Sequence, residues 1–429
     1  YGQFLNSIDP EMAEPILTEA LRLSENEDPQ RAARMKALGQ NFQEMGRNSE
    51  AEEMLNEALK VFQTLVGEKD AETLSVMAVL AQLHLSQGKL KPAQELFETA
   101  LPLMREVLDE KSFLSLESKE NLGEIYRQQG SFSQAETLFK ETIKVAAVEY
   151  GDEEPLVIQA KSHLAQLYED TGKLKQALAL HQQVYETDLA MLGENHPNTA
   201  GDLNNLASVR RRLGDYQKAE NLFRQSLDVM ISVLGEDSPQ SVSVMNNLAL
   251  LLENQGLYDE AEPLFKKAHT ISGKIQGERH PTTLALLNNL AFLYFMMNDF
   301  DKSEPAFIDV LERWTRTLGE SHPLRLKALN NLGRVQMKRG ALVEGEQTLL
   351  LALTLRRDKL GDDHPDVIRS LIDLGGAYLL MGRLSEAQLT LADALTKAEA
   401  VLGEQHPYTF EALNSLSDTL VAAGELTAG

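Results

Sequence analysis

Five histidines recur along the chain at one place in a repeating pattern, each directly before a proline. They are His196, His280, His322, His364 and His406. Imidazole serves in general acid–base catalysis and is the commonest metal ligand in proteins. A series of histidines could therefore indicate either chemistry. Successive members are separated by 42 residues or by twice that number, which places each histidine on its own structural unit.

This spacing argues against a shared metal site and favours a structural role. Equivalent positions on packed helices lie roughly 10 Å apart, whereas metal ligands lie within about 2 Å of one ion. Each histidine precedes a proline, a residue typical of the first helical turn, where four backbone N–H groups lack partners within the helix. We therefore expect the histidines to cap these N–H groups.

The rest of the sequence gives no support for an enzyme. The chain has no cysteine, which excludes disulfides, thiolate metal sites and cysteine nucleophiles. It contains no glycine-rich phosphate loop, nucleophile elbow or His-Glu-x-x-His helix. We expect a protein without catalytic activity, metal or cofactor.

Composition restricts the class of partner. Of the 429 residues, 43% are hydrophobic and 25% charged, and the net charge is −24. A charge of this sign disfavours broad contact with nucleic-acid phosphates or anionic lipid. The longest apolar runs, such as residues 349–355, are too short to span a bilayer. The chain begins with Tyr1 and shows no basic-then-apolar leader, so we expect a processed form or a fragment.

A 42-residue repeat must position any functional side chain. Glycine recurs in phase at 67, 151, 193, 235, 277, 319, 361 and 403, and from residue 151 on each of these glycines is followed four residues later by proline. Each repeat predicts two helices of roughly 16–19 residues with a short turn between them. In the unit that starts at Pro197, three- and four-residue spacing defines one face of each helix: Leu203, Leu206, Ala207 and Arg210, then Ala219, Phe223, Ser226 and Leu227. We expect a left-handed cap at Gly235.

Small residues at fixed places predict closely packed helix pairs. Alanine or glycine occupies the place of Ala207 in every repeat from Gly39 to Gly375, and phenylalanine or leucine fills the slot of Phe223. His181 stands in that large slot once. It is interpreted as a hydrogen-bonded core histidine, with a functional histidine as the alternative. Because one helix pair cannot bury its apolar face alone, neighbouring pairs must stack.

These slots resemble the tetratricopeptide signature, and residues 238–277 resemble its kinesin-light-chain type through the pattern "LNNLAxLxxxxGxYxEAEPLFxxA", with Met245 in place of its first leucine. The resemblance covers nearly the whole chain. It implies an all-α fold, a right-handed α-solenoid of stacked antiparallel helix pairs. We divide the chain into a partial repeat with a second helix only (1–28), nine helix-pair repeats (29–403) and a partial repeat with a first helix only (404–429). The incomplete ends suggest further domains or subunits that stack on the array.

The same resemblance implies that first helices line a concave groove. If the small residue is counted as position 8 of its repeat, positions 2, 5, 6, 9, 12 and 13 face that groove. Positions 5 and 6 are paired asparagines in four successive repeats: Asn204 and Asn205, Asn246 and Asn247, Asn288 and Asn289, Asn330 and Asn331. In the family, asparagines here contact bound peptide. The alternative is that they bond within or between neighbouring first helices, and both can hold.

Charged and apolar residues flank this series. The cations are Arg211, Arg212, Arg334 and Lys338, and between them lie Leu250, Phe292, Phe295 and Met296. Arginine binds carboxylates through paired hydrogen bonds, and aromatic and methionine side chains anchor apolar ligand groups. The alternatives are that the cations neutralise neighbouring acidic helices and that curvature buries the apolar residues.

Two functions follow from this reading. The first is a protein-interaction scaffold whose groove, chiefly residues 200–340, binds an extended or helical peptide segment with apolar or aromatic anchors and acidic flanks. The second is a structural or regulatory arm of a larger signalling protein or assembly, which binds through its ends or convex face. The partner is expected to be protein, without nucleic acid or membrane insertion. The sequence identifies no compartment, and we expect the cytoplasm rather than an organelle or the periplasm.

Overall fold

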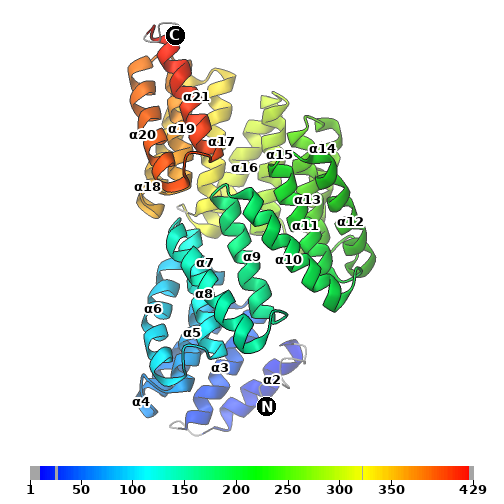
Figure 1. Ribbon diagram of the computed structural model, residues 1–429, viewed down its shortest axis with the longest axis vertical. Coiled ribbons are helices and arrows are strands. Elements are labelled where there is room, and N and C mark those ends of the chain that lie inside the picture. The colour runs from blue at the N-terminus through cyan, green and yellow to red at the C-terminus, as the bar shows by residue number, and fades with distance from the viewer. Residues whose placement is uncertain (1–9, 25–27, 321, 425–429) are drawn as a thin grey trace. The chain divides into compact units, whose positions relative to one another are not determined.

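The structure, a computed structural model, describes residues 10–24, 28–320 and 322–424 (Figure 1). Every regular element in these ranges is an α-helix. The chain divides into two compact units, residues 1–167 and residues 168–429. The boundary falls inside helix α9, so it follows contacts between helices and not the repeat boundaries.

The first unit contains a single second-type helix followed by helix pairs. Its helices are α2 (Pro10–Arg22), α3 (Pro29–Glu44), α4 (Asn48–Leu65), α5 (Ala71–Ser86), α6 (Leu90–Val107), α7 (Phe113–Gln128), α8 (Phe132–Tyr150) and most of α9 (Pro155–Asp170). Each pair packs on itself, and its second helix packs on the next first helix.

The second unit continues the same arrangement and carries the predicted site. Its helices are α10 (Leu174–Leu192), α11 (Pro197–Arg212), α12 (Tyr216–Leu234), α13 (Pro239–Asn254), α14 (Tyr258–Gln276), α15 (Pro281–Met296), α16 (Phe300–Leu318), α17 (Pro323–Arg339), α18 (Leu342–Leu360), α19 (Pro365–Leu380), α20 (Leu384–Leu402) and α21 (Pro407–Ala422). Its first helices have 16 or 17 residues and its second helices 19, as the repeat predicted.

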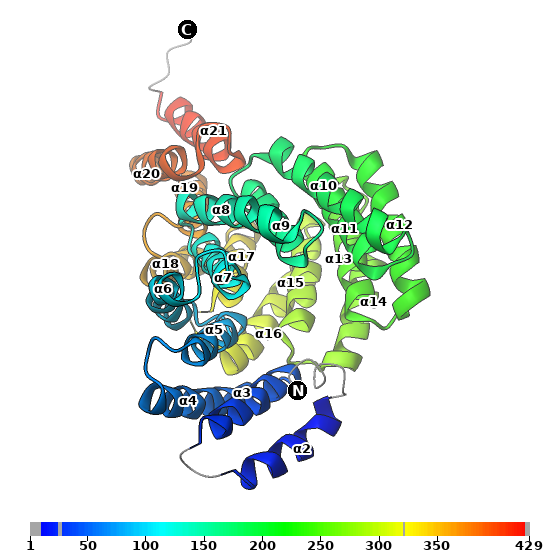
Figure 2. The same cartoon turned by 60° about the horizontal axis from the view of Figure 1, so that its bottom comes forward.

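First helices also contact one another, α11 with α13, α15 with α17, α17 with α19 and α19 with α21. The second helices α12 and α14 lie on the outer side of α11 and α13 (Figure 2). The surface where successive first helices meet is called the inner face below. It is the surface that the sequence analysis expected to line a groove.

The histidine series caps helices, as predicted. Nδ1 of each of the five histidines accepts a hydrogen bond from the backbone N–H two residues later, at 3.1–3.3 Å. Asp28, Asp70, Ser112 and Ser238 cap the equivalent helices through side-chain oxygens. Because Nδ1 must be an acceptor, each histidine caps in its neutral form.

The cap predicted at Gly235 differs in one angle. Its φ of 85° is positive, which favours glycine, but its ψ of 160° extends the chain where a left-handed helical turn would keep ψ near 50°. The Gly235 N–H still bonds to the carbonyl of Ile231 at 3.0 Å. The prediction of a left-handed helical cap was therefore wrong in ψ. The reason is that the chain must run on to the proline that opens the next helix.

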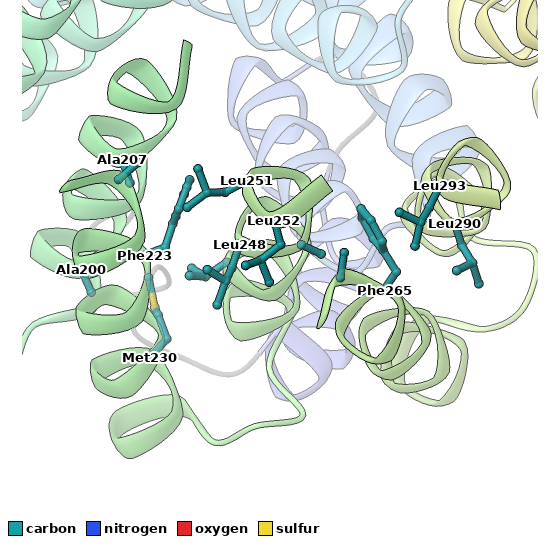
Figure 3. Close-up of a cluster of buried hydrophobic side chains, with 14 of the residues drawn as sticks. Ala200, Ala207, Phe223, Met230, Leu248, Leu251, Leu252, Phe265, Leu290 and Leu293 are labelled. Carbon is teal, nitrogen blue, oxygen red and sulfur yellow. The ribbon is translucent and has the colours of Figure 1, made fainter. Parts of the chain in front are cut away.

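The small positions allow the close packing that the repeat predicted. A Cβ added to Gly123 would lie 2.8 Å from the ring of Phe139 in the large slot, and one added to Gly375 would lie 2.5 Å from Leu391. In the second unit, alanine takes this place at Ala207 and Ala249, and the large residues fill the core. Phe223 and Phe265 lie on either side of the leucines of α13 (Figure 3).

His181 belongs to this core. Its side chain is buried and Nε2 lies 3.1 Å from a carboxylate oxygen of Glu169. These contacts favour the core interpretation over the functional one. Within the residues that the structure describes, no helix is both long and apolar enough to cross a lipid bilayer, and no group of three or more histidine or carboxylate side chains could hold a metal ion.

Candidate functional site

The paired asparagines form hydrogen bonds between neighbouring first helices. Asn247 Nδ2 on α13 donates to Asn204 Oδ1 on α11 at 2.9 Å, and Asn289 Nδ2 on α15 donates to Asn246 Oδ1 at 2.9 Å. Position 6 of one repeat therefore bonds to position 5 of the repeat before it, 43 residues earlier. The amides connect first helices, one of the two roles considered for them.

Further contacts join the two asparagines of a pair within one helix. Asn246 Nδ2 lies 3.5 Å from Asn247 Oδ1, and Asn288 Nδ2 lies 3.5 Å from Asn289 Oδ1. A carboxamide has two N–H donors and an oxygen with two lone pairs. Since these contacts use part of that capacity, the half-buried amides keep groups that can bond to a ligand.

The four pairs are not equally accessible. Asn204, Asn205, Asn246, Asn247 and Asn289 are half-buried, whereas Asn288, Asn330 and Asn331 are buried. Asn330 serves the interior of the protein. Its Nδ2 donates to Asp373 at 2.6 Å and its Oδ1 accepts from Ser370 at 3.0 Å. The accessible part of the series thus lies on α11, on α13 and at Asn289 in the middle of α15.

The two arginines at the end of α11 bind groups of their own chain. Arg211 Nη1 donates to Asn254 Oδ1 at 2.7 Å, and Arg212 donates to the backbone carbonyl of Glu169 at 2.7 Å and to its carboxylate at 3.3 Å. Burial lowers the pKa of Arg211. Burial also raises the pKa of Glu253, near Arg211, to about 7. These interactions favour the neutralising role for this pair of cations.

The opposite end of the predicted site combines a cation with aromatic rings. The Arg334 guanidinium carbon lies 5.4 Å from the ring centre of Phe292 and 5.3 Å from that of Phe295, whose rings are 5.7 Å apart. Asp373 contributes a carboxylate oxygen 3.5 Å from Arg334 Nε. Burial lowers the pKa of Arg334, and Asp373 opposes that effect. A cation over an aromatic face is an attractive arrangement that fixes both groups.

The apolar residues between the cations differ in exposure. Met296 is 40% exposed, while Phe292 and Phe295 are half-buried and pack against the core of α15 and α17. Leu250 is also half-buried and packs against the core around α13. Lys338 is exposed next to this group, at position 13 of α17. The structure therefore brings Phe292, Phe295, Met296, Arg334 and Lys338 together; we call them the aromatic patch.

A cavity of about 370 Å³ adjoins the aromatic patch, and the sequence analysis did not identify it. Phe295, Arg334 and Lys338 line its near side, and α19 and α21 provide Arg369, Ile372, Asp373, Gly376, Leu380 and Glu411, among others. It extends past residue 340, the predicted limit of the site. The sequence does carry one signal for it: position 9 holds Leu250, Phe292 and Arg334 in three repeats but glycine at 376.

A family model described as a tetratricopeptide repeat matches residues 9–64, 31–106, 114–190, 189–232, 199–274, 240–307, 282–341 and 327–400. The chain is a tetratricopeptide repeat protein. The family predicted from the small and large slots is thereby confirmed. Among curated proteins, none matches this tetratricopeptide repeat protein.

Three solved structures illustrate what this tetratricopeptide repeat protein is similar to. TPR-like repeats of Podosopora anserina, described as those of a kinesin light chain, are 24% identical over 47% of this chain and 96% of theirs, with a TM-score of 0.42. BtubC from P. vanneervenii is 22% identical over 56% of this chain and 93% of its own, with a TM-score of 0.41. A Rap protein complexed with competence and sporulation factor is 12% identical over 83% of this chain and 100% of its own, with a TM-score of 0.50.

Proposed function

We propose that this tetratricopeptide repeat protein is a non-catalytic scaffold whose inner face, chiefly residues 200–340, binds a peptide segment of another protein. The aromatic patch is the observation that carries the proposal. Phe292 and Phe295 are half-buried, and Met296 is 40% exposed. Such a surface anchors apolar side chains of a partner because their burial removes apolar area from water.

The cations of the aromatic patch favour acidic residues in the bound segment. Two members of the aromatic patch, Arg334 and Lys338, are cations in a chain of net charge −24. A local excess of cations within an acidic protein attracts a carboxylate that the rest of the surface repels. The bound segment is therefore expected to have apolar or aromatic anchors with acidic flanks.

The half-buried amides supply contacts that do not depend on ligand sequence. Asn247 and Asn289 each use one N–H toward the preceding helix and have a second N–H. Peptide backbones present alternating donors and acceptors, which a carboxamide can match. Family membership supports binding of protein, and the structurally similar Rap protein was solved in complex with competence and sporulation factor.

The proposal is tested by charge reversal on the inner and outer helices. Partners would first be isolated from the native source on the full chain and identified, and the affinity of one of them would then be measured. Lys338→Glu should weaken binding by about fivefold, the upper end for one exposed ion pair. Lys274→Glu makes the same charge change at an exposed position on the outer helix α14 and should leave affinity unchanged.

A double variant tests the apolar and amide contacts together. Met296→Ala with Asn289→Ala should reduce affinity further than Lys338→Glu does, while circular dichroism still shows a folded helical protein. If neither Lys338→Glu nor this double variant changes the affinity of the partner, binding does not use the inner face and the proposal fails.

A second function is favoured by one feature of the outer side. The last turns of successive second helices expose aliphatic residues in the same phase of the repeat: Met191, Leu192, Val233, Leu234 and Ile275. We therefore retain the alternative of a structural or regulatory arm that binds through its outer surface. Val233→Ser with Leu234→Ser would abolish binding in that case, whereas the inner-face variants would not.

A further inference from the structure

The cavity beside the aromatic patch exists because one side chain is missing from the repeat pattern. Gly376 occupies position 9 of α19, where the three preceding repeats have Leu250, Phe292 and Arg334. A Cβ added at Gly376 would meet no heavy atom within 4 Å. The adjacent Gly375 contrasts with it, because a Cβ there would lie 2.5 Å from Leu391. Packing requires glycine at 375 but not at 376.

The backbone conformation does not require glycine at position 376 either. The residue lies inside α19 and is not among the glycines with positive φ. A helix-interior glycine costs about 1 kcal/mol of stability relative to alanine. Gly376 therefore lowers the stability of the helix. What it provides instead is open space on the inner face.

The walls of this space are mainly apolar. Phe295, Met337, Ile372 and Leu380 line it, together with the backbone at Gly376. Its volume of about 370 Å³ is at the low end of the range of roughly 300–1,000 Å³ for ligand pockets. A cavity of this size and lining suits one large apolar side chain better than an extended ligand. We call it the Gly376 pocket.

The carboxylates at its rim are already bound within the protein. Arg369 donates to Asp373 from Nε at 3.0 Å and from Nη2 at 2.9 Å, and to Glu411 from Nη1 at 2.7 Å. Asn330 adds a third hydrogen bond to Asp373. Among the ion pairs of the described residues, none includes Lys338. With three cations and two carboxylates, the rim has a net positive charge.

We propose that the Gly376 pocket takes one aromatic side chain of the bound segment and that Lys338 and Arg334 bind a carboxylate beside that side chain. This inference rests on the proposed function, since Phe295 belongs to both the pocket and the aromatic patch. A segment that crosses the aromatic patch therefore reaches the pocket without leaving the inner face. The rim charge selects an acidic neighbour over a basic one.

Blocked tripeptides test the pocket without knowledge of the natural partner. The probes are acetyl-Glu-Trp-Glu-amide, acetyl-Lys-Trp-Lys-amide and acetyl-Glu-Ala-Glu-amide, titrated into full-length protein with ¹³C-labelled methionine and isoleucine methyl groups. The acidic tryptophan peptide should shift the Met337 and Ile372 methyl signals and bind about fivefold more tightly than the basic one. The alanine peptide should leave both signals in place.

A variant whose side chain fills the pocket provides the decisive test. Gly376→Leu places a side chain in the open space and improves helix propensity, so it should retain or raise the melting temperature while it reduces affinity for the acidic tryptophan peptide at least tenfold. Ser208→Leu is the matched control, because it adds leucine at position 9 of α11, away from the pocket. Gly376→Ala, a smaller change, should give a partial loss of affinity.

The outcomes separate this inference from the proposed function. If Gly376→Leu is folded and binds the acidic tryptophan peptide as the parent does, the pocket proposal is overturned. If that peptide shifts Met296 but neither Met337 nor Ile372, the inner face binds peptide and the pocket does not. If it shifts no methyl signal on the inner face, the pocket proposal also fails, while the proposed function is judged separately by the Lys338→Glu and Met296→Ala/Asn289→Ala variants.

Discussion

The side-chain amide of Asn247 donates a hydrogen bond to the side-chain oxygen of Asn204 across 2.9 Å, one repeat and one residue earlier. The same relationship links Asn289 to Asn246 at 2.9 Å. These bonds join α11 to α13 and α13 to α15 on the inner face. The asparagine pairs thus contribute to the stacking of repeats, whatever else they bind.

Substitution of these amides should therefore affect stability as well as binding. Asn247→Ala removes the donor to Asn204 and leaves a half-buried acceptor, so the free energy of unfolding should fall by about 1 kcal/mol. The double variant with Asn289 should lose about twice that amount if the two bonds act independently. Urea denaturation measures both, and Asn221→Ala on the exposed side of α12 serves as control. Equal stability of the double variant and the parent would show that the bonds contribute nothing.

Two adjacent glycines should respond in opposite directions to alanine. Gly375→Ala forces a methyl group against Leu391 and should lower the free energy of unfolding by about 1–3 kcal/mol. Gly376→Ala adds a methyl group in open space and should raise it by about 0.5–1 kcal/mol. Thermal unfolding of the two variants in one buffer measures the difference. A loss of stability in both would contradict the open space at Gly376.

The buried carboxyl pair of Asp188 and Asp202 should make the stability of the second unit fall as the pH rises from acid to neutral. Burial, together with the Asp188 carboxylate, raises the pKa of Asp202 to about 8, well above the value of about 4 expected in the unfolded chain. The folded state therefore holds a proton that the unfolded state releases. Its stability falls as pH rises from about 4 to about 8.

Asp202→Asn should remove this dependence. Asparagine keeps the shape and can donate to Asp188 without titrating, so the variant should gain about 1–3 kcal/mol over the parent at pH 8 and nothing at pH 4. Melting temperatures across this range, with the exposed Asp228→Asn as control, test the sign. A gain that is independent of pH would rule out titration of Asp202 as its cause.

The histidine cap of α17 should weaken in acid. Burial, with Lys359 nearby, lowers the pKa of His322 below the value of about 6.5 in the unfolded chain. Its contribution to stability is complete above pH 6.5 and is lost as pH falls through the lower folded value. Below that pH, protonated Nδ1 no longer accepts from the Leu324 N–H.

His322→Asp should preserve the cap at lower pH, as Asp70 does for α5. At pH 5 the variant should be more stable than the parent, while at pH 7.5 the two should be similar. His322→Ala should cost about 1 kcal/mol at pH 7.5. Urea titrations at both pH values measure these differences. Parallel pH profiles for parent and His322→Asp would contradict this assignment.

The repeat made the fold predictable, because its signals recur. The small residue at the place of Ala207 recurs in every repeat from Gly39 to Gly375, and phenylalanine at the slot of Phe223 and histidine before the helix proline each recur in several repeats, so exceptions such as His181 do not hide the pattern. The angle at Gly235 was not predictable in the same way. Positive φ follows from glycine, but ψ depends on the path to the next helix.

The candidate site was less predictable, because its contacts cross between repeats. Asn247 bonds to Asn204 rather than to Asn205 because successive first helices are offset by one residue, a relation absent from the pattern of either repeat. Arg212 meets Glu169 across the same interval of 43 residues. The Gly376 pocket depends on a side chain that is missing, which a search for functional residue types does not detect.

The hydrogen bond between Asn204 and Asn247 also sets the distance between successive asparagine pairs along the inner face. Hydrogen bonds between first helices fix the spacing of the asparagine pairs on the inner face. The second helices α12 and α14 lie on the outer side of α11 and α13 (Figure 2). The spacing of these amides along the inner face is therefore set by the packing of α11, α13 and α15. A chain that lies along α11, α13 and α15 meets amides at an interval set by the protein. On the proposed function, the segments that fit the inner face are those whose own repeat matches that interval.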